Sequence, residues 1–368
     1  MHNNRLITLA LLFVSALTLS AQSNVRLAVG TYTDGGSRGI YTYSFNQQTG
    51  KATLLDSLQT DNPSFVTFSS DGRLIYCVNE SGEAGSGVSA ISHDVATGHM
   101  VLLNRQPTFG ADPCYVAVKS GLLLTANYTG GSLSTFPIKT DGTIGPLDQQ
   151  FKGSTGGPFM PNQASAHIHT TVFAPGSRYV LASDFSHDRI LRYRLADGRL
   201  TEDGVAATMT AGSGPRHIAF SHDGRFFYVM SEVGDRVGVF SWDGSRGTAK
   251  RLEEHQADTI NAHGGADIHL SPDGRFLYVS NRLQHDGITI FKVNKATGRL
   301  TKVGYQPTKR HPRNFGITPN GRYLLCAARD DNRIQVFRID ARTGRLTDTG
   351  HDIVVSRPSC VTFWEAKK

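Results

Sequence analysis

The chain has 368 residues, of which 39% are hydrophobic and 19% are charged, and its formal net charge is +7 at pH 7. This composition excludes a disordered chain and is sufficient for a large buried core. The 39 glycines indicate a fold with many turns, and the positive charge leaves a nucleic acid, an anionic membrane or a small anion open as the partner.

The first segment has the features of a secretory signal. Residues 6–19 are mostly apolar, follow Arg5 and lead into Ser20-Ala21-Gln22. A basic flank, a short apolar stretch and small residues at its end are typical of a cleaved signal peptide. The stretch is shorter than the roughly 20 residues that span a bilayer, so we expect no membrane span. The sequence predicts a signal peptide over residues 1–21, cleavage near Ala21 and export to a periplasm or beyond.

The rest of the chain is built from a repeat of about 50 residues. The clearest copies contain the turns His222-Asp223-Gly224-Arg225 and Pro272-Asp273-Gly274-Arg275, each between two apolar runs. The turn glycine or its equivalent recurs at positions 72, 121, 177, 224, 274 and 321. A seventh copy, residues 357–363, stops before its turn because the chain ends.

Each repeat has the pattern of four antiparallel strands. Two runs joined by an Asp-Gly or Asn-Gly turn form a hairpin, a third run such as residues 288–293 ends in a Thr-Gly-Arg turn, and Leu300 begins a fourth run. Residues 25–32 match the second strand that the truncated seventh copy lacks. We therefore predict an all-β fold, a single seven-bladed β-propeller of four-stranded blades over residues 22–368, in which the N- and C-terminal strands share one blade and close the ring.

The four cysteines, at positions 77, 114, 326 and 360, are weak evidence for disulfides even in an exported chain. Cys77 and Cys326 occupy equivalent strands of the first and sixth copies, which are not neighbours in a ring of seven. We expect most of the cysteines to be buried free thiols.

The hairpin topology gathers polar side chains on one face of the ring. If the first strand of each blade lines the axis, the starts of the first strands meet the ends of the second strands on one face, and the Asp-Gly-Arg turns lie on the other. First-strand starts on this face include His167, His169, Arg216, His217, Asp267, His311 and Arg313. Second-strand ends there include Asn79, Glu80, Asn127, Tyr128, Asp184, Glu232, Asn281, Arg282 and Arg329.

This set of residues favours a small anionic ligand over the other partners. Guanidinium groups are suited to carboxylate or phosphate, and Glu232 and His169 can supply acid–base chemistry. Nucleic-acid binding is not expected, since the chain has no contiguous basic run with interleaved aromatics. We expect neither a metal nor an organic cofactor, because no Cys or carboxylate cluster completes a metal site with His167 and His169 and the sequence has no phosphate-binding loop. A serine nucleophile is not expected either, because the sequence has no Gly-x-Ser-x-Gly elbow between a strand and a helix.

On these residues the chain resembles the seven-bladed lactonase family, which groups propeller-type 6-phosphogluconolactonases with 3-carboxymuconate lactonizing enzymes. The resemblance covers essentially the whole mature chain. Its motifs here are Val29-Gly30-Thr31-Tyr32-Thr33, Thr125-Ala126-Asn127-Tyr128-Thr129-Gly130-Gly131-Ser132, His167-Ile168-His169, Gly214-Pro215-Arg216-His217, Ser231-Glu232 and Ser280-Asn281-Arg282.

The resemblance implies that His169, Arg216, Glu232 and Arg282 are the catalytic groups. Arg216 and Arg282 would hold a substrate anion and stabilise developing negative charge. His169 and Glu232 would activate water and protonate the leaving oxygen, in either order. Where family members often carry an Arg-Gln pair shortly before the His-x-His motif, this chain has Asn162-Gln163.

The leading hypothesis is a secreted or periplasmic hydrolase that opens an anionic sugar lactone. Two alternatives remain: a cycloisomerase that acts on a muconate-like dicarboxylate, and a non-enzymatic propeller that binds a carbohydrate or a protein on the same face. The sequence leaves monomer and dimer both open. Substrate-binding roles are assigned to Asn127, Tyr128, His167, His217, Asn281, His311, Arg313 and Arg329.

Overall fold

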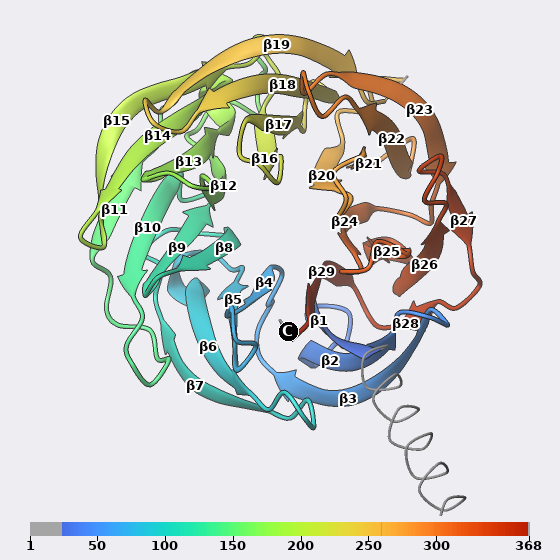
Figure 1. Cartoon of the computed structure of the whole chain (residues 1–368). Coiled ribbons are helices and arrows are strands. Elements are labelled where there is room, and N and C mark those ends of the chain that lie inside the picture. Colours follow the sequence, from blue (N-terminus) through green and yellow to red (C-terminus); the bar gives the residue numbers. More distant parts are fainter. Residues whose placement is uncertain (1–23, 259, 367–368) are drawn as a thin grey trace, which may run out of the picture.

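The computed structural model describes residues 24–258 and 260–366, so the predicted signal peptide lies outside the described residues. Seven β-sheets surround a central axis and form a closed ring (Figure 1). Neighbouring strands within the sheets pair antiparallel. The predicted all-β, seven-bladed propeller is confirmed. In the part of the chain that the structure describes, no helix is long and apolar enough to cross a membrane.

One blade combines strands from both ends of the chain and is called the terminal blade here. From the axis outward its strands are β29 (Pro358–Trp364), β1 (Asn24–Thr31), β2 (Gly39–Asn46) and β3 (Lys51–Gln59). The register between β1 and β29 places Arg26 opposite Trp364 and Gly30 opposite Cys360. This pairing confirms the prediction that the terminal strands share one blade and close the ring.

The other six blades follow in chain order, with the strand nearest the axis given first (Figure 1). Blade 2 contains β4 (Val66–Phe68), β5 (Leu74–Asn79), β6 (Gly87–His93) and β7 (Met100–Gln106). Blade 3 contains β8 (Pro113–Lys119), β9 (Leu122–Asn127), β10 (Ser132–Pro137) and β11 (Gln149–Lys152). Blade 4 contains β12 (Ile168–Phe173), β13 (Tyr179–Asp184), β14 (Arg189–Ala196) and β15 (Arg199–Thr208).

The second half of the ring repeats this arrangement. Blade 5 contains β16 (Pro215–Phe220), β17 (Phe226–Ser231), β18 (Arg236–Asp243) and β19 (Thr248–Gln256). Blade 6 contains β20 (Gly265–Leu270), β21 (Phe276–Asn281), β22 (Gly287–Val293) and β23 (Leu300–Pro307). Blade 7 contains β24 (Pro312–Ile317), β25 (Tyr323–Ala328), β26 (Arg333–Ile339), β27 (Leu346–Asp348) and β28 (Ile353–Val354). Short 3-10 helices lie in the connections: η1 (Glu83–Gly85), η2 (Phe185–His187) and η3 (Arg329–Asp331).

Blade 7 differs from the predicted four strands at its outer edge. The edge is divided into β27 and β28, and both of these strands pair with β26. Between them Gly350 has a φ of 68°, a left-handed conformation that glycine adopts more readily than other residues. A turn at Gly350 thus interrupts the outer strand, while the strands nearer the axis continue as in the other blades.

The apolar core lies between neighbouring blades. One cluster joins Phe226 and Val239 of blade 5 to Leu277 and Phe291 of blade 6, and the equivalent clusters join other neighbours around the ring. All four cysteines are buried in the described structure and are free thiols, as predicted.

Tyrosines of the second strands connect neighbouring blades by hydrogen bonds. The Tyr228 hydroxyl donates to the carbonyl oxygen of Gly298 in the next blade at 3.0 Å, and Tyr278 donates to that of Gly344 at 2.9 Å. Tyr323 makes the equivalent bond between blade 7 and the terminal blade at 2.9 Å. Because these carbonyls lie in turns of the third strand, each bond fixes one blade against the next.

Replacing Tyr228 with Phe removes this hydroxyl and leaves the buried Gly298 carbonyl without its donor. We expect Tyr228→Phe to lower the free energy of unfolding by about 1–2 kcal/mol, measured by denaturant unfolding. Tyr193→Phe is the control, because Tyr193 is also buried but its hydroxyl donates to no residue that the structure describes. Equal losses in the two variants would contradict the role of the inter-blade bond.

Candidate active site

A pocket of about 390 Å³ opens on the face where the first strands begin and the second strands end. This is the face that the topology of the repeat predicts. The pocket is lined by Tyr32, Asp34, Glu80, Cys114, Tyr128, His169, Glu232, Arg313, Arg329 and Arg357.

Glu232 lies on one wall of the pocket between two buried arginines. Its Oε2 lies 2.8 Å from Arg216 Nε and 3.1 Å from Arg282 Nη2. Glu232 directly follows β17, and its backbone is bonded on both sides, to Gly214 and to Gly265. A side chain at Gly265 would place its Cβ 2.1 Å from the carbonyl oxygen of the residue before Glu232, so only glycine allows β20 to approach this closely.

The two arginines beside Glu232 are largely occupied by protein acceptors. Arg216 Nη1 donates to the carbonyl oxygen of Ala266 at 2.7 Å. Arg282 donates through Nε to Gly264 at 3.0 Å and through Nη2 to Gly265 at 3.2 Å. Both side chains are buried, and neither lines the pocket. These contacts fix the arginines, and the arginines in turn orient Glu232.

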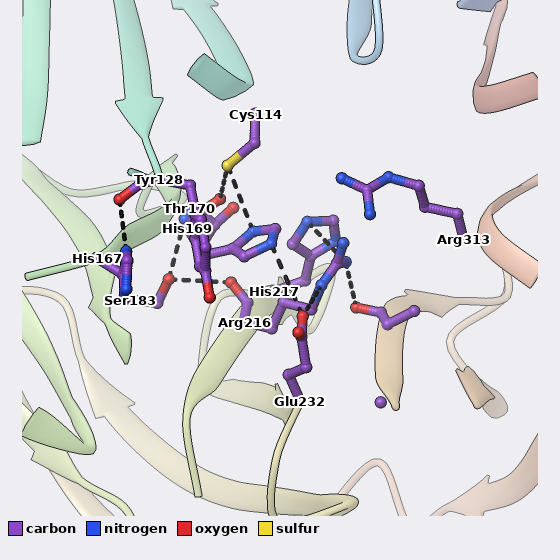
Figure 2. A network of polar contacts seen from close by, with 12 residues as sticks. Cys114, Tyr128, His167, His169, Thr170, Ser183, Arg216, His217, Glu232 and Arg313 are labelled. Carbon is purple, nitrogen blue, oxygen red and sulfur yellow. Dashed lines mark hydrogen bonds and ion pairs between the residues drawn. The ribbon is translucent and has the colours of Figure 1, made fainter. Parts of the chain in front are cut away.

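His169 faces Glu232 from the start of β12 (Figure 2). Its Nε2 lies 4.0 Å from Glu232 Oε2. On the other side of the ring, Cys114 Sγ lies 3.6 Å from His169 Nδ1 and donates to the backbone carbonyl of His169 at 3.4 Å. Tyr128 packs edge-on against the His169 ring and stacks on His167. The imidazole is therefore held in one orientation from two sides.

The charges around the pocket set the protonation states of these two groups. Burial, followed by the positive charge of Arg216, holds the pKa of His169 well below its usual 6.5, so the ring is neutral at pH 7. Burial alone would raise the pKa of Glu232, but Arg282, Arg216 and Arg313 outweigh burial and lower it below 4.5. At neutral pH the site thus presents an ionised carboxylate beside a neutral imidazole.

His217 supports Arg216 from behind instead of entering the pocket. Its Nδ1 lies 2.7 Å from Asp267 Oδ1, and its Nε2 lies 3.3 Å from Arg216 Nη1. Burial, and then the charge of Arg216, lower the pKa of His217 to about 4 although Asp267 acts in the opposite direction. Neutral His217 that donates Nδ1–H to Asp267 has a free lone pair on Nε2 for Arg216.

The opposite wall carries Arg313 and Arg329. Arg313 Nη2 lies 3.6 Å from Glu80 Oε1, and its guanidinium lies over the ring of Tyr32, 5.3 Å from the ring centroid. The Tyr32 hydroxyl donates to Glu80 at 2.9 Å. Arg329 Nε donates to the carboxylate of Asp330 at 2.7 Å. Glu80 thus belongs to the pocket, where it is the counter-charge of Arg313.

His311 lies between two arginines at the side of the pocket. Its Nε2 is 3.4 Å from Arg282 Nη1, and its Nδ1 is 3.2 Å from Arg329 Nη2. Burial, followed by the charges of Arg282 and Arg329, lowers the pKa of His311 to about 2. The neutral ring keeps the two guanidinium groups apart.

Sequence comparison places the chain in a known family. The family described as "Lactonase, 7-bladed beta-propeller" matches residues 26–363. The chain belongs to this lactonase family. A 6-phosphogluconolactonase of Bacillus subtilis is 34% identical over 344 residues, which are 91% of this chain and 97% of the relative. A 6-phosphogluconolactonase of Formosa agariphila is 35% identical over 321 residues, which are 84% of this chain and 90% of the relative.

Solved structures agree with this assignment. The periplasmic gluconolactonase of Pseudomonas aeruginosa is 31% identical, with a TM-score of 0.88 over 93% of this chain and 99% of the other. None of these three relatives has a name that refers to muconate lactonization, so the comparisons support the lactonase branch of the sequence hypothesis and give no support to the muconate branch.

The structure brings most of the predicted site residues of this lactonase-family chain together, in two layers. The pocket wall includes Tyr128, His169, Glu232, Arg313 and Arg329. A buried layer behind the wall contains Arg216, His217, Arg282 and His311. His167 is half-buried beside Tyr128 and bonds to its carbonyl oxygen at 2.8 Å, so it supports the wall without lining it.

Asn127 and Asn281 require correction, because both lie inside their own blades. Asn127 Nδ2 donates to the hydroxyls of Ser132 and Ser134, each at 3.0 Å, and Asn281 Nδ2 donates to Thr289 at 3.0 Å. Both side chains are fully buried and bond to the third strand of the blade. They therefore connect the ends of the second strands to the third strands and do not line the pocket.

A shift of one residue separates these asparagines from the residues of the pocket. Successive residues of an extended chain point to opposite sides, so the last residue of each second strand faces the blade and the following residue faces the axis. Asn127 ends β9 and is followed by Tyr128, and Asn281 ends β21 and is followed by Arg282. The same rule places Tyr32, which follows β1, in the pocket.

Four of the residues that line the pocket were not among the predicted site residues. A fifth, Glu80, was predicted to lie on this face of the ring but was given no role. Tyr32, Asp34 and Arg357 belong to the terminal blade, to which the strand-end rule was not applied. Cys114 is the second residue of the inner strand β8, but it carries no charge that would have singled it out. Application of the rule to residues 25–32 and 357–363 would have selected Tyr32 and Arg357.

Proposed function

We propose that this protein is a hydrolase that opens the ring ester of a sugar lactone. The observation that carries the proposal is the juxtaposition of an ionised Glu232 and a neutral His169 on one wall of the axial pocket. Membership in the lactonase family supports it, as do the names of the relatives, which are 6-phosphogluconolactonases and a gluconolactonase.

In the proposed reaction, His169 is the general base. The Cys114 thiol donates to the backbone carbonyl of His169, so its sulfur is available to accept Nδ1–H, which leaves the Nε2 lone pair free to accept a proton. A water between His169 Nε2 and Glu232 loses a proton to Nε2 as its oxygen attacks the lactone carbonyl carbon. The tetrahedral intermediate then collapses, the bond to the ring oxygen breaks, and His169 returns the proton to that oxygen.

Glu232 acts by orientation and charge in this scheme. Arg216 and Arg282 both contact its Oε2, so we assign no proton transfer to it. Its carboxylate accepts a hydrogen bond from the attacking water and stabilises the imidazolium that forms on His169. The sequence hypothesis assigned Arg216 and Arg282 to binding the substrate anion. In the structure both side chains contact Glu232 and donate to backbone carbonyls. We assign them to the positioning of Glu232.

Removal of either group of the pair is expected to abolish most of the activity. Glu232→Gln and His169→Ala should each reduce kcat for the hydrolysis of glucono-1,5-lactone by about 100-fold or more, because general-base assistance is worth about 10²–10⁴. A pH-stat assay that includes a chelator and is corrected for spontaneous hydrolysis measures this loss. Circular dichroism verifies that the variants fold.

Glu253→Gln is the matched control for Glu232→Gln. Glu253 is also a largely buried carboxylate paired with an arginine, Arg299, but it lies on the outer strand β19 of the same blade. The control should keep wild-type kcat. If Glu232→Gln and His169→Ala also retain wild-type kcat, the proposed assignment is wrong.

The low pKa of His169 predicts a flat pH profile on the acid side of neutrality. A histidine with the usual pKa of about 6.5 loses roughly tenfold of its neutral form between pH 7.5 and 5.5. Because the pKa of His169 lies well below 6.5, its neutral fraction stays nearly constant over this interval. We expect kcat/KM, corrected for spontaneous hydrolysis, to change less than twofold from pH 7.5 to 5.5, and a tenfold decrease would contradict the assignment.

We also propose that the protein acts outside the cytoplasm. The support is the apolar run over residues 6–19 after Arg5, together with the printed name of the Pseudomonas relative, which is a periplasmic protein. Mass spectrometry of the protein purified from a native host after cell fractionation is expected to give an N-terminus near Gln22 in the non-cytoplasmic fraction. An intact N-terminus in the cytoplasm would contradict export.

A further inference from the structure

The charged groups around the pocket nearly cancel. Counting the residues that line it and their ion-pair partners, the site holds five guanidinium groups and four carboxylates. Each carboxylate lies within 4.0 Å of a guanidinium group. The pairs are Glu232 with Arg216 and Arg282, Glu80 with Arg313, Asp330 with Arg329, and Asp34 with Arg357.

The remaining titratable groups of the pocket add no charge at neutral pH. The pKa of His169 and that of His311 are lowered, so both rings are neutral. Burial raises the pKa of Tyr32, of Tyr128 and of Cys114, so these groups keep their protons. The pocket and its paired groups therefore carry a single excess positive charge.

Arg313 is the positively charged group that can contact a ligand in the pocket. It lies opposite the pair of His169 and Glu232 and points toward it (Figure 2). Its guanidinium donates no hydrogen bond to any residue in the described ranges, and its nearest carboxylate, that of Glu80, is 3.6 Å away. The side chain is only 16% exposed. Its five N–H donors are thus held at the pocket wall, free for a ligand acceptor.

We propose that the substrate is an uncharged sugar lactone without a phosphate group, and that Arg313 stabilises the oxyanion that forms from its carbonyl oxygen. This inference rests on the proposed lactone hydrolysis. Attack of water on an uncharged lactone places one negative charge on the former carbonyl oxygen in the tetrahedral intermediate, and the product sugar acid also carries one negative charge. A single excess positive charge matches both species.

A phosphorylated lactone fits this pocket less well. A phosphate monoester adds about 1.5–2 negative charges at pH 7. Within the pocket wall it would meet the carboxylates of Glu80 and Asp34, and like charges in a partly buried site repel one another. The other two arginines of the pocket wall, Arg329 and Arg357, are already paired with Asp330 and Asp34, so only Arg313 is left for an anionic group. This proposal departs from the sequence hypothesis of an anionic lactone, because the proposed substrate becomes anionic only during the reaction.

The first experiment compares kcat/KM of the wild-type protein for glucono-1,5-lactone and for its 6-phosphate. We expect the uncharged lactone to be preferred at least tenfold. Equal values or a preference for the 6-phosphate would overturn this inference and leave the lactonase proposal intact. Hydrolysis of neither compound would contradict both proposals.

The second experiment changes the charge of the pocket. Asp34→Asn adds one unit of positive charge at the mouth, so the kcat/KM ratio of the 6-phosphate to the uncharged lactone should rise about three- to tenfold. Asp148→Asn is the control, because Asp148 is also a surface carboxylate paired with an arginine but lies outside the pocket. An unchanged ratio in Asp34→Asn would contradict the argument from charge.

The third experiment tests Arg313 itself. Arg313→Met should lower kcat for glucono-1,5-lactone by about 100-fold, with a much smaller change in KM, because an oxyanion contact forms only as the transition state is reached. Arg313→Lys retains the charge and should recover part of the loss, which a purely structural role would not predict. If Arg313→Met folds and keeps kcat within threefold of the wild type, the oxyanion role is wrong.

Discussion

Closure of the ring by β1 and β29 is the constraint on which the site depends. Residues from the terminal blade and from blades 2, 3, 4, 5 and 7 line the pocket, and blade 6 supplies Arg282 from behind. No single blade contains a site by itself. Glu232 and His169 share one pocket with Arg313 and the terminal blade only because the strands at the two ends of the chain pair, which brings blade 7 round beside the terminal blade and across the axis from blade 4.

Within this frame the buried carboxylate of Glu232 determines the electrostatics of the site. Burial of a carboxylate is unfavourable unless charge and hydrogen bonds compensate for it, and here two guanidinium groups do so. The same two groups lower the proton affinity of their neighbours, directly for His217 beside Arg216 and for His311 beside Arg282. Burial, together with these two guanidinium groups, thus keeps the imidazoles around Glu232 neutral.

The sequence was sufficient for the fold and for the face that carries the site, because both follow from repeat length and hairpin direction. The sequence was not sufficient to decide which of two adjacent residues at a strand end faces the axis. Asn281 and Arg282 differ by one position, and only the place where β21 ends decides which of them turns toward the axis. The sequence also did not reveal which arginines are paired with protein acceptors. Arg313 and Arg216 both lie at the start of an inner strand, but Arg216 donates to the carbonyl oxygen of Ala266 in the next blade, whereas Arg313 donates no hydrogen bond in the described part of the chain.

The pairing of arginines with carboxylates also determines how far the charge of the pocket extends. Oppositely charged groups a few ångströms apart produce a field that decays quickly, and salt at physiological strength screens what remains beyond about 8 Å. The arginines of the Asp-Gly-Arg turns lie at the other end of the inner strands, so they do not draw ligands to the mouth. We therefore expect a substrate to reach this pocket by diffusion without electrostatic steering, at a rate that depends little on ionic strength.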